Sequence, residues 1–153
     1  MTKFQKLSLF MLRVSMGWLM FYAGITKIIN PNWSAADYLG GAKTFSGFYN
    51  WFLRPDILPT TNFINEWALT LLGIFLILGF FVKISSIGGL VLMFLYYFPV
   101  LDFPNILPHS FIVDEHIIYA FVLLFFAASG VGKVWGVDKF IFSKSSRWGA
   151  WLG

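Results

Sequence analysis

The segment 7–29 is an apolar run that contains two positive charges, Arg13 and Lys27. An α-helix rises ~1.5 Å per residue, so a run of this length can cross the hydrocarbon core of a bilayer. One stripe of this helix combines the two cations with small or flexible residues: Arg13, Gly17, Met20, Gly24 and Lys27. Charges inside a membrane are costly, so this stripe is expected to face other helices and to be structural or functional.

The composition is that of a membrane protein. Of the 153 residues, 58% are hydrophobic and only 12% are charged, whereas soluble domains have about 25% charged residues. Cysteine is absent, which excludes disulfide relays, thiolate nucleophiles and cysteine-ligated metal or iron–sulfur sites. We expect no metal site and no covalently bound cofactor. The net charge of +4 follows membrane topology and forms no nucleic-acid-binding patch.

Four apolar segments predict an all-α integral membrane protein. The expected spans are 7–29, 63–82, 84–101 and 112–135, all within a single domain covering residues 1–153. The connection around Lys83, Ser85 and Ser86 predicts a very tight hairpin between the second and third spans. Short connections favour an antiparallel four-transmembrane-helix bundle.

The long connection 30–62 is rich in aromatic residues, including Trp33 and Trp51. Aromatic residues at helical spacing predict one or two short helices that lie in the membrane interface. This excursion is also the surface on which we expect a membrane or extracytoplasmic protein partner, and an oligomer is compatible with it. The polar, basic tail 136–153 follows the last span.

The basic residues predict the orientation of the bundle. Seven fall on the side of the termini: Lys3, Lys6, Lys83, Lys133, Lys139, Lys144 and Arg147. The opposite side has only Lys43 and Arg54 outside the spans. Loops rich in lysine and arginine stay in the cytoplasm, so both termini are expected there, with the connections 30–62 and 102–115 outside.

Small residues recur on one face of every expected helix. The glycines expected to pack against neighbouring helices are Gly17, Gly24, Gly73, Gly89 and Gly130. In lipid, such residues allow two backbones to approach closely. Packing alone is a sufficient explanation for the small residues on these faces.

Ionisable residues gather at the outer ends of three helices. Lys27, Glu66 and His116 are the predicted catalytic residues, because an imidazole titrates near neutral pH and carboxylates accept protons. The predicted quinone-binding residues around them are Trp18, Tyr22, Trp33, Tyr96, Asp114 and Tyr119. A quinone needs proton donors and acceptors, and its tail can enter from lipid. The alternative is that Lys27 and Glu66 only neutralise each other as an ion pair.

Arg13 lies on the inner half of its helix, about 21 Å along the axis from Lys27. The inner halves of the other three spans contain no acid. Two explanations stay open: the side chain reaches up to the headgroups, or it binds hydroxyls, backbone carbonyls, lipid phosphate or a ligand. We expect Arg13 to be a structural buried charge first.

Scattered motifs along the chain resemble the DoxX/DoxD family of membrane proteins. They are R-x3-G-x6-G-x2-K followed by Pro31 and Trp33, then E-x6-G-x5-G, then H-x13-G-x-G with W-G-x-D. These motifs fall on Arg13, Gly17, Gly24, Lys27, Glu66, Gly73, Gly79, His116, Gly130, Gly132, Trp135, Gly136 and Asp138. The resemblance implies a four-helix bundle in the cytoplasmic membrane of a bacterium or archaeon.

The DoxD branch further implies the membrane subunit of thiosulfate:quinone oxidoreductase. The outer side has three cations, Lys27 among them, against six carboxylates, so its field repels a dianion such as thiosulfate. A neutral quinone meets no such barrier. The predicted function is therefore a quinone-interacting oxidoreductase component. The alternatives are a non-catalytic structural or assembly subunit of a larger membrane complex and, least favoured, a transporter-like bundle.

Overall fold

The computed structural model describes residues 1–107 and 110–141. Lys144 and Arg147, which the sequence analysis considered, lie outside the described residues, as does most of the tail. In chain order, the elements are α1 (Lys3–Ile28), α2 (Ala36–Gly40), α3 (Ser46–Phe52), α4 (Leu58–Leu78), α5 (Val82–Val100), β1 (Asn105–Leu107), β2 (Ser110–Phe111), α6 (Glu115–Ser129), the 3₁₀ helix η1 (Val131–Lys133) and α7 (Asp138–Ile141).

Within residues 1–107 and 110–141, three helices are long and apolar enough to cross a membrane, namely α1, α4 and α5. They confirm the helical membrane character that the sequence predicted. The fourth helix, α6, has 15 residues, which at ~1.5 Å per residue is about 22 Å. It ends before the predicted boundary at residue 135, because Gly130 adopts a left-handed conformation with φ 61° and stops the helix.

The turn between α4 and α5 lies a few residues earlier than the sequence analysis placed it. Gly79 has φ 69° and ends α4, while Phe81 has φ 48° and precedes α5. A glycine in the left-handed region is the commonest helix terminator. Lys83, Ser85 and Ser86 therefore belong to the first turns of α5 and not to a hairpin loop.

Three glycines allow α1 and α4 to cross in close contact. A Cβ atom on Gly17 would lie 2.9 Å from the carbonyl oxygen of Gly73, and one on Gly24 would lie 2.5 Å from the backbone nitrogen of Thr70. No side chain larger than hydrogen fits at such distances. The face that carries Arg13 and these glycines is buried, as the spacing predicted.

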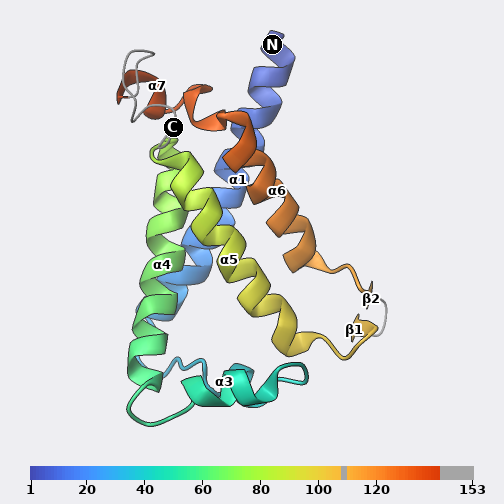
Figure 1. Ribbon diagram of the computed structural model, residues 1–153. Coiled ribbons are helices and arrows are strands. Elements are labelled where there is room, and N and C mark those ends of the chain that lie inside the picture. The colour runs from blue at the N-terminus through green and yellow to red at the C-terminus, as the bar shows by residue number, and fades with distance from the viewer. Residues whose placement is uncertain (108–109, 142–153) are drawn as a thin grey trace.

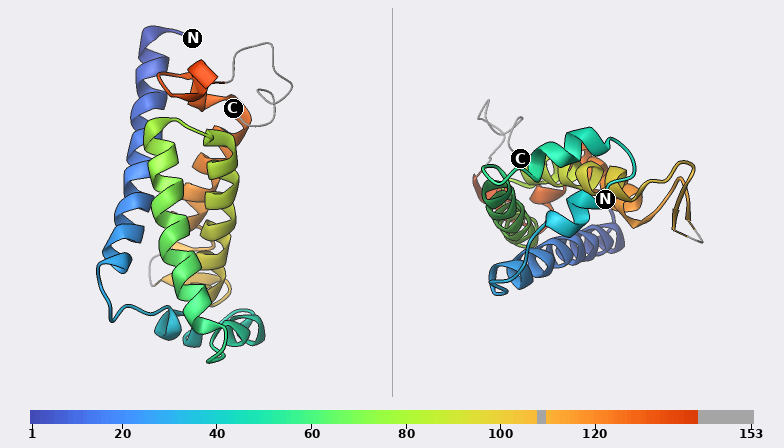
Figure 2. Two further views of the ribbon diagram at one scale, coloured as in Figure 1. Left: turned by 90° about the vertical axis from the view of Figure 1, so that its left-hand side faces the viewer. Right: turned by 90° about the horizontal axis from the view of Figure 1, so that it is seen from below.

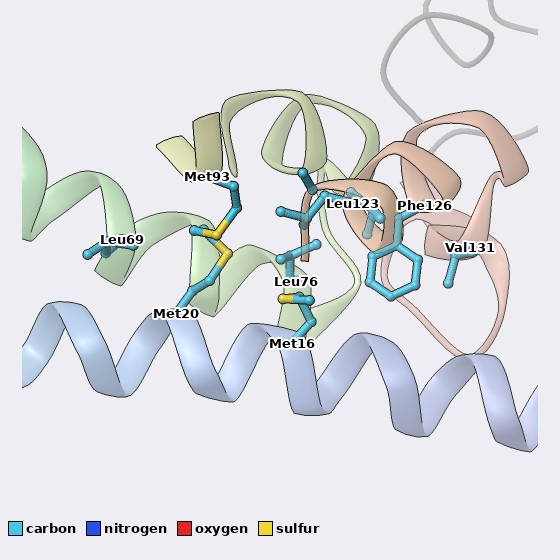
Figure 3. Close-up of a cluster of buried hydrophobic side chains, with 10 residues drawn as sticks. Met16, Met20, Leu69, Leu76, Met93, Leu123, Phe126 and Val131 are labelled. Atoms are coloured by element: carbon cyan, nitrogen blue, oxygen red, sulfur yellow. The ribbon is translucent and has the colours of Figure 1, made fainter. Parts of the chain in front are cut away.

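The apolar core fills the middle of the bundle, where all four helices contribute (Figure 3). Its fully or nearly fully buried side chains are Met16, Met20, Leu69, Leu76, Val82, Met93, Ala120, Leu123, Phe126 and Val131. Gly89 of α5 lies beneath Met20 and Leu123, whose methyl groups would be 3.1 Å and 3.0 Å from a Cβ at this position. Gly130 differs from the other predicted packing glycines, because nothing lies within 4 Å of its would-be Cβ.

The four helices form two antiparallel pairs, α1 with α4 and α5 with α6. The pairs meet near the α4–α5 turn and diverge toward the end that carries α2 and α3 (Figure 1). We call the end with the start of α1, the α4–α5 turn and α7 the inner end, and the opposite end the outer end. α2 and α3 lie across the outer end (Figure 2), where the sequence placed interfacial helices.

Hydrogen bonds fix the α2–α3 excursion to the outer end of α5. The backbone nitrogen of Lys43 donates to the carbonyl of Pro99 at 3.0 Å, and the hydroxyl of Thr44 donates to the carbonyl of Leu101 at 2.6 Å. Ala35, Leu39 and Tyr49 form a separate small core beneath the excursion. A two-stranded hairpin, β1–β2, which the sequence analysis did not anticipate, extends the loop that follows α5.

Candidate functional site

A cavity of about 400 Å³ lies at the outer end, where the two helix pairs diverge and the α2–α3 excursion covers them. Its lining is mainly apolar and aromatic, which is typical of small-molecule sites. The polar and aromatic side chains that line it are Lys27, Trp33, Ser34, Tyr38, Tyr49, Phe52, Thr61, Asn65, Tyr96, Glu115, His116 and Tyr119.

Lys27 is the cation of this cavity. Its ammonium lies 5.2 Å from the ring centroid of Trp33 and 5.8 Å from that of Tyr96. No carboxylate oxygen of the described residues lies within 4 Å of it, and Glu66 acts on it only at longer range. Cation–π contacts of this kind stabilise a charge without neutralising it. Lys27 therefore remains available to a ligand that is negatively charged or becomes so.

His116 and Asp114 form a hydrogen-bonded pair at the start of α6. The Nδ1 atom of His116 lies 2.6 Å from Oδ2 of Asp114. The other carboxylate oxygen of Asp114 accepts from the backbone nitrogen of Ile117 at 3.2 Å, so the N-cap of α6 also fixes this carboxylate. With Nδ1 bound to Asp114, Nε2 is the ring nitrogen that His116 can offer to a ligand in the cavity.

Asn65 and Tyr96 connect α4 to α5 in the cavity wall. The side-chain nitrogen of Asn65 donates to the hydroxyl of Tyr96 at 2.6 Å. The Oδ1 atom of Asn65 is buried and has no partner among the described residues. A buried amide oxygen without a partner is costly, so this atom is a further polar group that a ligand or a water can satisfy.

Two tyrosines hold the excursion over the cavity. The hydroxyl of Tyr49 donates to the carbonyl of Leu95 at 3.0 Å, and the hydroxyl of Tyr38 donates to the carbonyl of Tyr96. Burial raises the pKa of both Tyr38 and Tyr49 above the ordinary value for tyrosine. Both therefore stay neutral at physiological pH and act as fixed donors, not as groups that exchange protons.

The structure brings together part of the predicted site. Five of the predicted residues line the cavity: Lys27, Trp33, Tyr96, His116 and Tyr119. Asp114 stands behind His116 and does not line the cavity itself. Glu66 is not in the lining, and Lys27 makes no close ion pair with it. Trp18 and Tyr22 stack on each other on the exposed side of α1, away from the cavity.

Sequence reasoning missed Asn65 and Glu115 as cavity residues, together with Tyr38 and Tyr49. Asn65 directly precedes Glu66, and Glu115 directly precedes His116. The depth of these positions along the helices was therefore visible from the sequence. Which neighbour on each helix faced inward depended on helix rotation, which the sequence pattern left open.

Arg13 occupies a second polar site at the inner end. Its side chain is 0% exposed, and Nη2 lies 3.4 Å from the carbonyl oxygens of both Val134 and Trp135. The Nε and Nη1 atoms have no hydrogen-bond partner among the described residues. Arg13 thus binds backbone carbonyls and does not extend to the headgroup region. This is one of the two explanations that the sequence analysis left open.

Asp138 supplies the acid that the inner halves of the spans lack. It is 0% exposed, interacts electrostatically with Arg13, and accepts from the backbone nitrogens of Phe81 at 2.8 Å and Val82 at 3.1 Å. It therefore caps α5 from a segment 56 residues away in the sequence. The sequence analysis quoted Asp138 only as part of the W-G-x-D motif and did not connect it with Arg13.

Comparison with protein families gives a match over the first part of the chain. The family model for DoxX matches residues 8–101, a range that contains most of α1 and all of α4 and α5. No curated protein and no solved structure matches the chain. Because the matched range covers more than half of the sequence, the chain belongs to the DoxX family.

Proposed function

We propose that this protein is the quinone-binding component of a membrane oxidoreductase, with the quinone ring in the outer cavity. The observation that carries the proposal is the arrangement of Lys27 and His116 on two different helices around one mainly apolar cavity of about 400 Å³. Aromatic walls suit a flat, neutral ring. The two side chains supply a positive charge and one of the two protons that reduction to the quinol requires, and the second proton comes from water.

The chemistry divides between the two residues. Reduction of a quinone places negative charge on its oxygens, and each oxygen then takes up a proton. The ammonium of Lys27, with no carboxylate within 4 Å, stabilises that charge in an environment of low dielectric constant. His116 exchanges one of these protons through Nε2, while Asp114 holds the ring by Nδ1 at 2.6 Å.

The electrons must come from another protein, since the chain has no cysteine and no cofactor motif. The proposal therefore assigns only the quinone end of the reaction. Lys43 and Arg54, the other cations of the outer end, are paired with Asp102 at 3.3 Å and Asp56 at 3.1 Å. This outer end offers no obvious dianion site, so thiosulfate is not part of the proposal.

A second candidate function is a non-catalytic subunit of a larger complex. Phe45, Phe48 and Trp51 expose half or more of their surface on the excursion. Exposed aromatic rings of this density mark a membrane interface or a protein contact. Stable copurification with a partner, together with no binding of quinone, would favour this function over the first.

Quinone binding to the purified protein in nanodiscs tests the proposal. Trp33 lines the cavity, so a short-chain benzoquinone is expected to quench tryptophan fluorescence in a saturable way. His116→Asn and Lys27→Met should weaken this binding by about tenfold or more, because a hydrogen bond to a charged group contributes ~1.5–3 kcal/mol. Lys43→Met, which removes an exposed cation of the same end, is the control and should bind normally.

Glu66→Gln tests whether Glu66 takes part in quinone binding or only balances the charge of Lys27. Normal quinone binding in this variant would show that Glu66 is only an electrostatic neighbour, and loss of binding would place it in the site. Unchanged binding in both His116→Asn and Lys27→Met would overturn the proposed function.

A further inference from the structure

We propose that the ligand of the outer cavity is an amphiphile whose apolar tail leaves the cavity sideways, between α1 and α6, into the outer leaflet of the bilayer. The inference rests on the proposed function, which puts the quinone ring in the cavity. It adds the chemical class of the rest of the ligand, an apolar tail, and the route by which this tail reaches the lipid. It follows from which sides of the cavity are closed.

The excursion covers much of the water-facing side of the cavity. Leu39, Tyr49 and Phe52 form part of its lining, and the excursion is fixed to α5 through Tyr49 at 3.0 Å and through Tyr38. It is also fixed to α4, where the backbone nitrogen of Ala35 donates to Oδ1 of Asn62 at 3.0 Å. A ligand that entered from water would have to break these bonds.

Two of the lateral sides are also closed. α1 and α4 cross at glycine contacts that leave no space between their backbones. Between α4 and α5, the Asn65–Tyr96 hydrogen bond of 2.6 Å spans the cavity wall. Deeper in the bundle, the side chain of Leu72 packs on Gly88, 3.3 Å from a would-be Cβ.

The side between α1 and α6 is different. No hydrogen bond, ion pair or ring contact joins these two helices in the part of the chain that the structure describes, and they make few backbone contacts. They belong to different helix pairs, which diverge toward the outer end (Figure 1). Deeper in the bundle, Met20 of α1 and Leu123 of α6 both pack on Gly89, so the proposed opening is confined to the height of the cavity.

The residues at this opening are apolar on the α1 side. Leu19 and Ala23 line the cavity, and Leu19 is also 37% exposed on the outer surface of the bundle, which makes it the rim. Tyr119 lines the cavity from α6. An alkyl or isoprenoid tail at this place would contact Leu19, Ala23 and the lipid beyond, while its polar ring stays beside Lys27 and His116.

Photo-crosslinking tests the route directly. The probe is a benzoquinone with a decyl tail that carries a diazirine at its last carbon, added to the full-length protein in nanodiscs. The same ring without a tail is the competitor, and a decyl diazirine without the ring measures general labelling from lipid. Some of the labelling should disappear when the tailless ring is added as competitor. We expect this competed label on α1 near Leu19 and on the facing part of α6.

A pair of matched variants provides the second readout. Leu19→Phe enlarges the rim, whereas Ser15→Phe adds the same ring to an exposed position of α1 one turn further in. The decyl tail should increase the affinity of the ring for the unmodified protein but not for Leu19→Phe. Binding of the ring without a tail should be unchanged in this variant. Ser15→Phe should retain the gain.

The outcomes separate the two proposals. Competable label on α4, on α5 or on the excursion, with normal binding of the tailless ring, would overturn the route and leave the proposed function intact. Absence of any competable label and of any binding of the tailless ring would overturn both.

Discussion

The guanidinium of Arg13 fills the space beside Gly79 that a side chain at this position would need. Gly136 lies on another side of the same guanidinium, with its would-be Cβ 2.5 Å from Nη1. Residues from α1, from the α4–α5 turn and from the segment before α7 thus meet at one buried cation. Positions 79 and 136 require glycine because the guanidinium of Arg13 occupies the space that a side chain would need. This packing connects the motifs of three segments that are distant in the sequence.

Gly79→Ala is expected to destabilise the protein more than Gly130→Ala. Both glycines are left-handed, with φ 69° and 61°, so each substitution costs roughly 1–2 kcal/mol of backbone strain. Only at Gly79 does the new methyl group also displace Arg13. Thermal unfolding in detergent, with Gly47→Ala as the open-space control, measures the difference. Equal losses at positions 79 and 130 would contradict this account of Arg13.

Arg13→Met is expected to cost about 1.5–3 kcal/mol, because it removes charge-assisted hydrogen bonds to the carbonyls of Val134 and Trp135. It also removes the electrostatic attraction to Asp138. The variant leaves the carboxylate of Asp138 buried without its cation. Adding Asp138→Asn should return part of the loss, because the amide oxygen still accepts a backbone hydrogen bond at the start of α5. A double-mutant cycle of unfolding free energies measures this coupling. Strictly additive losses would show that the two residues act independently.

The stability of the inner end should depend on pH through Asp138. Burial raises the pKa of this carboxyl above its ordinary 3.8, although the hydrogen bonds from Val82 and Phe81 and the charges of Arg13 and Lys133 partly oppose the rise. The folded state therefore binds the proton more tightly than the unfolded state. The contribution of Asp138 to stability is complete below pH 3.8 and is lost as pH rises through its folded-state pKa.

Unfolding midpoints measured from acid to neutral pH test this dependence. Asp138→Asn should remove the part of the slope that belongs to this group, so the variant's midpoint should vary less with pH than that of the unmodified protein. A slope that is the same in both proteins would assign the pH dependence to other groups.

Gly73→Ala is expected to disrupt the α1–α4 pair. Its Cβ would lie 2.7 Å from the carbonyl oxygen of Gly17 and 2.7 Å from the Cα of Phe21, and neither backbone can move without separating the helices. Gly88→Ala is the matched control in α5, because its Cβ would meet only flexible methyl groups of Leu72 at 3.3–3.4 Å. The yield of folded protein on size-exclusion chromatography should fall sharply for Gly73→Ala and remain normal for Gly88→Ala.

The orientation of the bundle can be tested with single cysteines, since the natural chain has none. Trp51 of α3 and Phe140 of α7 are both exposed, and these two helices lie at opposite ends of the bundle (Figure 1). In intact cells, Trp51→Cys should react with a maleimide that cannot cross membranes, and Phe140→Cys should react only after lysis. The reverse pattern would place the outer end, and its cavity, in the cytoplasm.

Helix depth was accessible from the sequence alone, and this placed Lys27 and His116 at the same end of the bundle. The rise per residue is constant, so a position along an apolar run is also a position across the membrane. The glycine stripe of α1 was readable for a similar reason, because the helical period places Gly17 and Gly24 on one face. Helix rotation was less accessible, and so Asn65, one residue before Glu66, was overlooked as a cavity residue.

The sequence by itself determined that apolar helices cross the membrane, that small residues face the bundle, and that the outer end carries the ionisable groups. These properties depend on local periodicity and on the cost of exposing charge to lipid. Only the tertiary structure decided that Asp138 lies within electrostatic reach of Arg13, that Gly130 ends α6 instead of packing against a neighbour, and that Asp114 holds His116 by Nδ1. The first depends on segments that lie more than a hundred residues apart, and no local pattern encodes the direction in which the chain returns. The other two depend on the backbone and side-chain conformations that packing selects at a helix end.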